Sequence, residues 1–110
     1  MKQSVKLVDT DSADLRRTVD AELLADGRLT IDGQDLGGAV ERVWGEDMIE
    51  YEWSFSISPE DVTKLKLALG CTGDVLAVLK ERFSGEMVSD LGPFLKTHGI
   101  PYGFWSRFGD

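Results

Sequence analysis

The most reactive side chains of this sequence are one cysteine, Cys71, and one histidine, His98. A thiol and an imidazole work as nucleophile and base only when they lie within hydrogen-bonding distance. Cys71 follows the predicted end of a helix at Gly70, and no loop of backbone N–H donors is evident beside it. His98 falls in the last turn of a short predicted helix, where its charge favours the negative end of the helix dipole. We therefore expect a protein that is not an enzyme.

Three aspartates close together, Asp9, Asp11 and Asp14, suggest a calcium loop, because hard cations bind clustered oxygen atoms. The pattern fails at its key positions. If Asp9 opened the loop, Asp14 would occupy the glycine position and Asp20 would replace the bidentate glutamate. A zinc site needs three or four converging ligands, and the chain has one cysteine and one histidine. We expect neither a metal nor another cofactor.

Two further patterns suggest sites but are weak. Residues 33–38 are rich in glycine but lack the lysine of a P-loop, and Asp35 would repel a phosphate. Glu50 and Glu52 share one face of a predicted strand about 7 Å apart, a separation that also occurs in glycosidases. In a chain of 110 residues, a solvated sheet face explains the two glutamates better than an active site does.

Acidic and aromatic residues alternate between positions 41 and 52, where Arg42 is the one base. Aromatic anchors among like charges are typical of surfaces that bind a basic protein, because charge speeds encounter and aromatic side chains supply contact area. The alternative is that the aromatic residues are core and the acids keep the protein soluble. The candidate partner-binding residues are Glu41, Trp44, Glu46, Asp47, Glu50 and Glu52.

The first half of the chain is expected to supply the strands. Alternating apolar and polar residues predict strands over 4–8, 15–24, 28–31 and 48–57. A turn at 25–27 joins the second and third strands, since Gly27 can adopt the positive φ that the turn needs. Asp32 and Gly33 are expected to close this hairpin, a polar break is expected at 9–12, and spacing favours a helix over 34–44.

The strand at 48–57 has the clearest pattern, with the apolar face Ile49, Tyr51, Trp53, Phe55 and Ile57. The glutamates and serines between them form the opposite face. We expect Trp53 to be buried in the core and Glu52 to face solvent. Trp44 is the best candidate for an exposed tryptophan.

The second half is expected to supply three helices. Ser58 and Pro59 are typical of a helix start, and Gly70 of a helix end. Similar signals predict a second helix from about 74 to 83, ended by Gly85, and a third from about 91 to 98. The tail 100–105 is too aromatic to remain in solvent, so we expect it to lie extended against the core or the sheet edge.

Composition narrows the class of protein. The chain has 110 residues, 42% of them hydrophobic, which suits one domain spanning 1–110. Its net charge of −8 opposes binding to nucleic acid and to anionic membranes. No apolar run is long enough for a membrane span, and no signal-peptide core is present, so we expect a cytoplasmic location. The single cysteine is consistent with a reducing compartment.

Three segments carry a resemblance: Gly33-Gln34-Asp35-Leu36-Gly37, Tyr51-Glu52-Trp53 and His98-Gly99-Ile100-Pro101-Tyr102. Through them the chain resembles small acidic bacterial proteins of uncharacterised function. It is similar in type to the immunity proteins of bacterial toxin systems, which block a basic toxin by binding it. The resemblance implies an interaction role and transfers no functional residue.

Taken together, these patterns predict an α+β domain. An antiparallel sheet of three or four strands, mostly from the first half, would pack against about three helices, mostly from the second half. The expected function is a non-enzymatic acidic protein-binding domain, as in an immunity-type protein that neutralises a basic bacterial toxin. The alternative is a small-ligand-binding or regulatory domain with a pocket beneath the aromatic tail. The oligomeric state stays open, because an edge strand could pair with itself.

Overall fold

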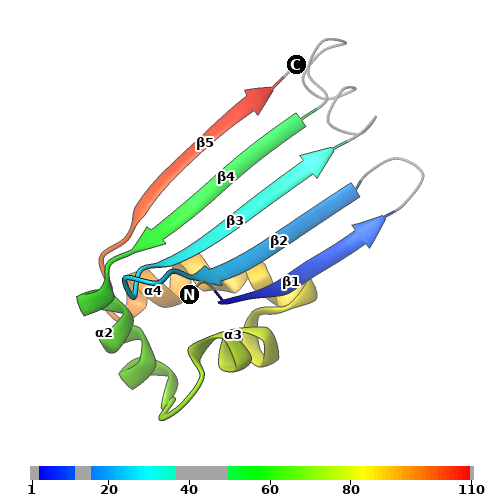
Figure 1. Ribbon diagram of the computed structural model, residues 1–110. Coiled ribbons are helices and arrows are strands. Elements are labelled where there is room, and N and C mark those ends of the chain that lie inside the picture. Colours follow the sequence, from blue (N-terminus) through cyan, green and yellow to red (C-terminus); the bar gives the residue numbers. More distant parts are fainter. Residues whose placement is uncertain (1–2, 12–15, 37–49, 110) are drawn as a thin grey trace.

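The structure of the protein is a computed structural model, which describes residues 3–11, 16–36 and 50–109. Among the described elements, four strands precede the helices and a fifth follows them (Figure 1). The strands are β1 (Gln3–Asp11), β2 (Arg16–Leu23), β3 (Leu29–Leu36), β4 (Glu50–Ile57) and β5 (Gly103–Gly109). The helices are α2 (Pro59–Leu69), α3 (Val75–Phe83), the 3-10 helix η1 (Gly85–Asp90) and α4 (Leu91–Thr97).

The five strands form one sheet in the order β1-β2-β3-β4-β5, and each pairs antiparallel with its neighbours. The α+β class is confirmed, as is the origin of the described helices in the second half. The expected strand number of three or four is wrong, because the aromatic tail forms a fifth strand. After β4 the chain forms the described helices and then returns to the sheet, where β5 pairs with β4 (Figure 1).

The β2–β3 hairpin forms as its turn residues predict. Gly27 adopts a φ of 93°, which its missing side chain permits. Asp26 accepts hydrogen bonds from the Arg28 backbone N–H and guanidinium, each at 3.0 Å. The bond from the backbone N–H of Arg28, aided by its guanidinium, lowers the pKa of Asp26 below its usual value.

Two predicted breaks in the first half are wrong. β3 does not end at Asp32-Gly33 but continues to Leu36, so the first residues of the expected helix 34–44 belong to a strand. Its remaining residues lie outside the described residues. β1 likewise continues through the expected polar break as far as Asp11, because Asp9 and Thr10 pair with β2. In both places the pairing with a neighbouring strand outweighs local propensity.

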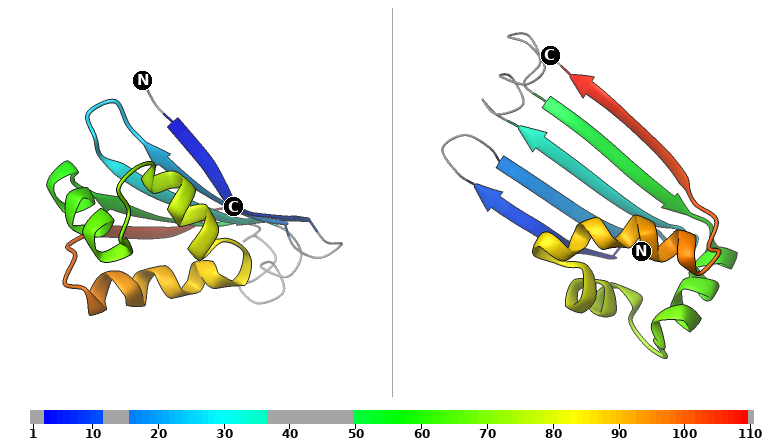
Figure 2. Two further views of the ribbon diagram at one scale, coloured as in Figure 1. Left: turned by 90° about the horizontal axis from the view of Figure 1, so that it is seen from below. Right: turned by 180° about the vertical axis from the view of Figure 1, so that it is seen from behind.

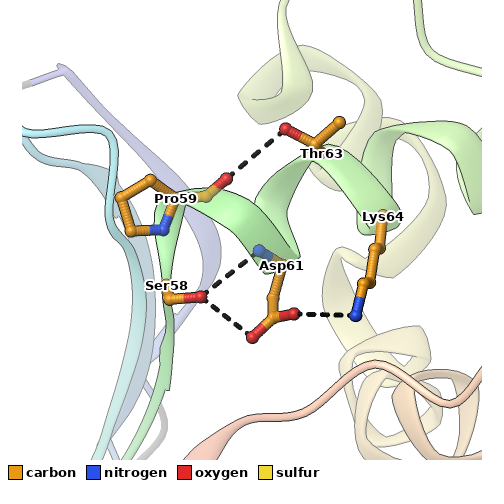
Figure 3. Close-up of polar contacts among 5 residues, drawn as sticks. All are labelled: Ser58, Pro59, Asp61, Thr63 and Lys64. Carbon is orange, nitrogen blue, oxygen red and sulfur yellow. Dashed lines mark hydrogen bonds and ion pairs between the residues drawn. The ribbon is translucent and has the colours of Figure 1, made fainter.

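The helix boundaries follow the sequence signals closely. The Ser58 hydroxyl accepts the Asp61 backbone N–H at 3.3 Å and donates to the Asp61 carboxylate at 2.9 Å (Figure 3). Lys64 pairs with the same carboxylate at 3.4 Å, and Gly70 closes α2 in the left-handed conformation. Asp74 caps α3 by accepting the Leu76 N–H at 3.0 Å. These local contacts confirm the predicted starts of both helices.

The third helix is also confirmed, as α4, and Pro93 lies in its first turn, where a missing N–H is tolerated. The preceding turn η1 has no counterpart among the predicted elements.

The helices lie on one side of the sheet (Figure 2). They cover the end that contains the β2–β3 turn, and there Leu29, Ile31 and Ile57 are completely buried. The described helices leave the opposite end of the strands uncovered on this side (Figure 2). Among the described residues, no helix has the length and apolar content to cross a bilayer.

Candidate functional site

The strand register places one polar pair and one aromatic residue in a row on the helix side of the sheet. Arg17 of β2 lies directly opposite Asp35 of β3, and Asp35 lies opposite Tyr51 of β4. In the next row toward the helices, Val19 and Trp53 flank Gly33. Residues two apart on a strand share a face, so both rows face the helical layer.

A pocket of about 430 Å³ opens where the helical layer meets these rows. Its sheet wall comes from four of the five strands, and its opposite wall comes from η1 and α4. Val88 and Ser89 contribute from η1, and Gly92 and Pro93 from the first turn of α4. The volume falls in the range of about 300–1,000 Å³ that is usual for small-molecule sites.

Aromatic rings form most of the sheet wall. Tyr51, Trp53 and Phe55 follow one another on one face of β4, and Phe104 adds a ring from β5. The centroids of Trp53 and Phe55 are 5.5 Å apart, and those of Phe55 and Phe104 are 5.3 Å apart. Tyr102 supports Phe55 from outside the wall at 5.1 Å. These separations are typical of favourable ring pairs, so the wall has a defined shape.

Gly33 allows the Trp53 indole to lie against the backbone of β3. A Cβ atom at position 33 would come within 2.0 Å of Trp53 Cε2. No other residue type fits there without moving the ring. Gly33 therefore shapes the pocket, although it does not line it.

An ion pair closes the end of the pocket farthest from the core. Arg17 Nε and Nη2 donate to the two carboxylate oxygens of Asp35 at 2.9 and 3.3 Å. The Asp35 side chain is 15% exposed and that of Arg17 is 49% exposed. Two parallel N–H···O bonds fix the planes of both groups. The result is an oriented polar end on a mainly apolar pocket.

The described lining of the pocket offers few groups for nucleophilic catalysis. Among the described residues that line the pocket there is no histidine or cysteine. The hydroxyl of Ser89 donates to the Glu86 carbonyl at 3.1 Å, and Asp35 is engaged by Arg17. Nucleophilic catalysis needs a base beside the nucleophile, and no such pair lines the described pocket.

Of the predicted partner-binding residues, Glu52 is the one whose side chain the structure describes, and it does not line this pocket. Glu52 faces the opposite side of the sheet, the helix-free face, where the described part of the chain places no helix, and it pairs there with Arg107 at 3.2 Å. Glu50 is the first residue of β4. The other predicted residues, Glu41, Trp44, Glu46 and Asp47, lie outside the described residues.

The face alternation of β4 is confirmed, but the burial of its residues differs from expectation. Trp53 and Glu52 are both half-buried, because Trp53 borders the pocket and Glu52 is paired across strands. Ser54, expected to meet solvent, is 5% exposed and donates to Asp32 at 2.6 Å.

The end of the aromatic tail lies extended at the sheet edge, as expected, and Ile100 at its start is buried, yet two of its rings are exposed. Phe104 and Trp105 are 54% and 51% exposed. Both belong to β5, which is an edge strand of the described sheet.

Where the structure describes them, the remaining candidates of the sequence lie in or beside different elements. Asp9 lies in a strand, and Asp14 lies outside the described residues. No group of three or more histidine, cysteine, aspartate or glutamate side chains suited to a metal occurs among the described residues. Cys71 is half-buried after α2, and the exposed His98 ends α4 with its ring 4.3 Å from that of Phe94.

Sequence reasoning missed the ion pair and the glycine of this pocket. Arg17 and Asp35 are distant in sequence, and only the β2–β3 register places them together. The predicted turn at 25–27 indicates that register. If the two strands pair residue by residue from the turn, with Leu23 opposite Leu29, position 17 lies opposite position 35. No comparable local signal links Gly33 with Trp53.

Comparison with known proteins adds no relative: no family model, no curated protein and no solved structure matches this chain.

Proposed function

We propose that this protein is a non-enzymatic binding domain, and that its site is the pocket between β2–β5 and the first turn of α4. The ligand is a small, flat and largely apolar molecule with one polar end. The supporting observation is the wall of four aromatic rings that ends at the paired Arg17 and Asp35. This arrangement matches the small-ligand alternative of the sequence analysis.

The ligand class follows from the two parts of the pocket. Rings of Tyr51, Trp53, Phe55 and Phe104 favour an aromatic or planar group, through burial and ring–ring contact. A guanidinium has five N–H donors. Arg17 uses one N–H on Nε and one on Nη2 to bind Asp35. Its other N–H groups can donate to an acceptor such as a ligand carbonyl. Because the ion pair balances its own charge, a ligand without net charge suits this end best.

Filling the pocket tests the proposal. A Cβ atom at Gly92 would lie 3.5 Å from Phe55 Cζ, in ordinary contact, so a longer side chain there enters the pocket. The Gly92→Leu variant should fold, because leucine favours the helix, and should no longer bind. Gly73→Leu is the matched control, since a Cβ atom at Gly73 meets open space.

The measurement is a ligand-observed NMR screen of flat aromatic amides and ketones, followed by titration of the hits. We expect hits that shift the Trp53 and Phe104 resonances, bind Gly73→Leu as they bind the wild type, and fail to bind Gly92→Leu. Hits that bind all three proteins equally, or no hits at all, would contradict the pocket as the site.

A second candidate is the acidic protein-binding function, in which the domain neutralises a basic protein as an immunity-type protein does. The observation that favours it lies on the helix-free face, where Asp20, Asp32 and Glu52 surround the exposed Trp105. It ranks second because Lys6 and Arg107 already pair with two of these acids.

The second candidate is tested by neutralising Glu46, Asp47, Glu50 and Glu52 together. If this acidic group steers a basic partner, the variant should associate more slowly, and salt should reduce the difference. Partners captured from a native lysate at low and at high ionic strength supply the protein for the kinetic measurement. An acidic partner, or equal association rates, would contradict this candidate.

A further inference from the structure

The two outer strands of the described sheet, β1 and β5, differ in whether they carry features that prevent pairing with other chains. β1 has a register shift between Lys6 and Val8, and its sequence includes Asp9 and Asp11. Bulges and charges of this kind protect an edge strand. β5 has neither protection, since its pairing with β4 is regular and Arg107 is its one charged residue. In the described part of the chain, β5 pairs with β4 alone (Figure 1).

The sequence of β5 is nearly symmetric about its centre. Gly103-Phe104-Trp105-Ser106-Arg107-Phe108-Gly109 repeats the order glycine, phenylalanine and a large side chain on each side of Ser106. An antiparallel pair of identical strands has a two-fold axis, so it places each residue opposite its mirror position. When β5 pairs with its own copy in this way, each residue therefore faces a residue of the same or similar size.

We propose that β5 is a dimerisation strand, and that it pairs antiparallel with β5 of a second copy around Ser106. In this register, Ser106 faces the partner's Ser106, Trp105 faces the partner's Arg107 and position 104 faces position 108. Directly opposite residues share a face of the sheet. The two sheets therefore join into one, and both helical layers lie on the same side.

The side chains of β5 suit this contact. Those of residues 104–107 are all exposed, including the large rings of Phe104 and Trp105. Facing strands place Trp105 against the partner's Arg107, which permits a cation–π contact. Such a pair occurs on each side of the axis.

The distribution of charged residues also favours pairing through β5. The chain carries a net charge of −8, so two copies repel each other as they approach. β5 contains no acidic residue and one arginine. An approach through β5 therefore brings together the part of the sheet where this repulsion is weakest.

Substitutions that introduce a charge at Ser106, the residue on the two-fold axis, test the proposal. We expect the wild type to sediment as a dimer in analytical ultracentrifugation. Ser106→Lys and Ser106→Glu each place two like charges opposite one another, so each should raise the dimer dissociation constant at least about tenfold. An equimolar mixture of the two variants should regain dimers, because lysine then faces glutamate. Ser106 does not line the ligand pocket, so this result is independent of ligand binding.

A cysteine at the axis gives a second, positive readout. In a Cys71→Ser background, Ser106→Cys should form an intermolecular disulfide under mild oxidation, because the two sulfur atoms face each other across the axis. Thr63→Cys in the same background is the control, since Thr63 is exposed and belongs to α2, outside the proposed contact strand. Its crosslinking should be much slower.

Three results would overturn the inference. One is a wild type that remains monomeric at high micromolar concentration. Another is a dimer that the Ser106→Lys and Ser106→Glu variants retain unchanged. The third is equal crosslinking of the Ser106→Cys and Thr63→Cys variants, which would indicate random collision.

Discussion

At the scale of single residues, Gly33 has the most specific role in the structure. It sits opposite Trp53 in the sheet, and the indole occupies the space that a side chain at position 33 would need. Glycine within a strand costs backbone entropy and often marks a close approach by another group. Here that approach sets the position of one ring of the pocket.

Replacing Gly33 with alanine should therefore destabilise the protein by about 1 to 3 kcal/mol, the usual cost of overpacking. The matched control is Gly92→Ala, because its new Cβ atom would lie 3.5 Å from Phe55 in ordinary contact. Because Pro93 follows and disfavours a helical residue with a Cβ atom before it, this change should alter stability by less than about 1 kcal/mol. Urea denaturation measures both values, and equal effects of the two substitutions would contradict the packing described.

Trp53 and Glu52 are neighbours on opposite faces of β4 and provide a second comparison. Trp53→Ala should cost about 3 kcal/mol, the lower end of the range for buried aromatic side chains, because Trp53 is half-buried. Glu52→Gln should change stability by less than about 0.5 kcal/mol, since its partner Arg107 is 65% exposed. Denaturant titration separates these cases. Similar small values for both would mean that the face assignment of β4 is wrong.

At the scale of elements, the helices are defined by residues close to their ends. Ser58 has an extended backbone and bonds the Asp61 N–H, as an N-cap residue does (Figure 3). Ser84 stands before η1 with a similarly extended backbone, but its side chain makes no capping bond. The two serines therefore separate the effect of the capping bond from that of the backbone conformation.

Ser58→Ala should lower the free energy of unfolding by about 1 kcal/mol, through loss of the cap. Ser84→Ala should have a clearly smaller effect, because no capping bond is lost. Thermal unfolding of both variants measures the difference. A larger loss at Ser84 than at Ser58 would show that the capping bond is not what stabilises the start of α2.

At the scale of the whole molecule, charge is distributed unevenly. Residues 1–55 contain thirteen acids and six bases, whereas residues 56–110 contain seven acids and six bases. Most of the net charge of −8 therefore belongs to the half that supplies β1–β4. The fifth strand, which carries one arginine and no acid, comes from the nearly neutral half.

The proposed dimer should therefore strengthen with salt. Raising the ionic strength from about 0.01 M to about 0.1 M shortens the Debye length from about 30 Å to about 10 Å. This screens the repulsion between two acidic copies more than the close contacts along β5. We expect the dimer dissociation constant to fall several-fold in sedimentation experiments. A constant that rises with salt would mean that opposite charges hold the copies together, contrary to pairing through β5.

Much of this protein follows from its sequence because the relevant interactions are local. The alternation in β4, the turn at Gly27 and the caps at Ser58 and Asp74 involve residues a few positions apart. Tertiary structure decided that β3 continues through Gly33. The Trp53 indole from the neighbouring strand β4 fills the space that a side chain at position 33 would occupy. Tertiary structure also decided the pocket, since Arg17 and Asp35 meet only through the strand register and Phe104 joins them only after the chain returns as β5. Contacts between distant residues depend on how whole elements pair, and local pattern does not specify that pairing.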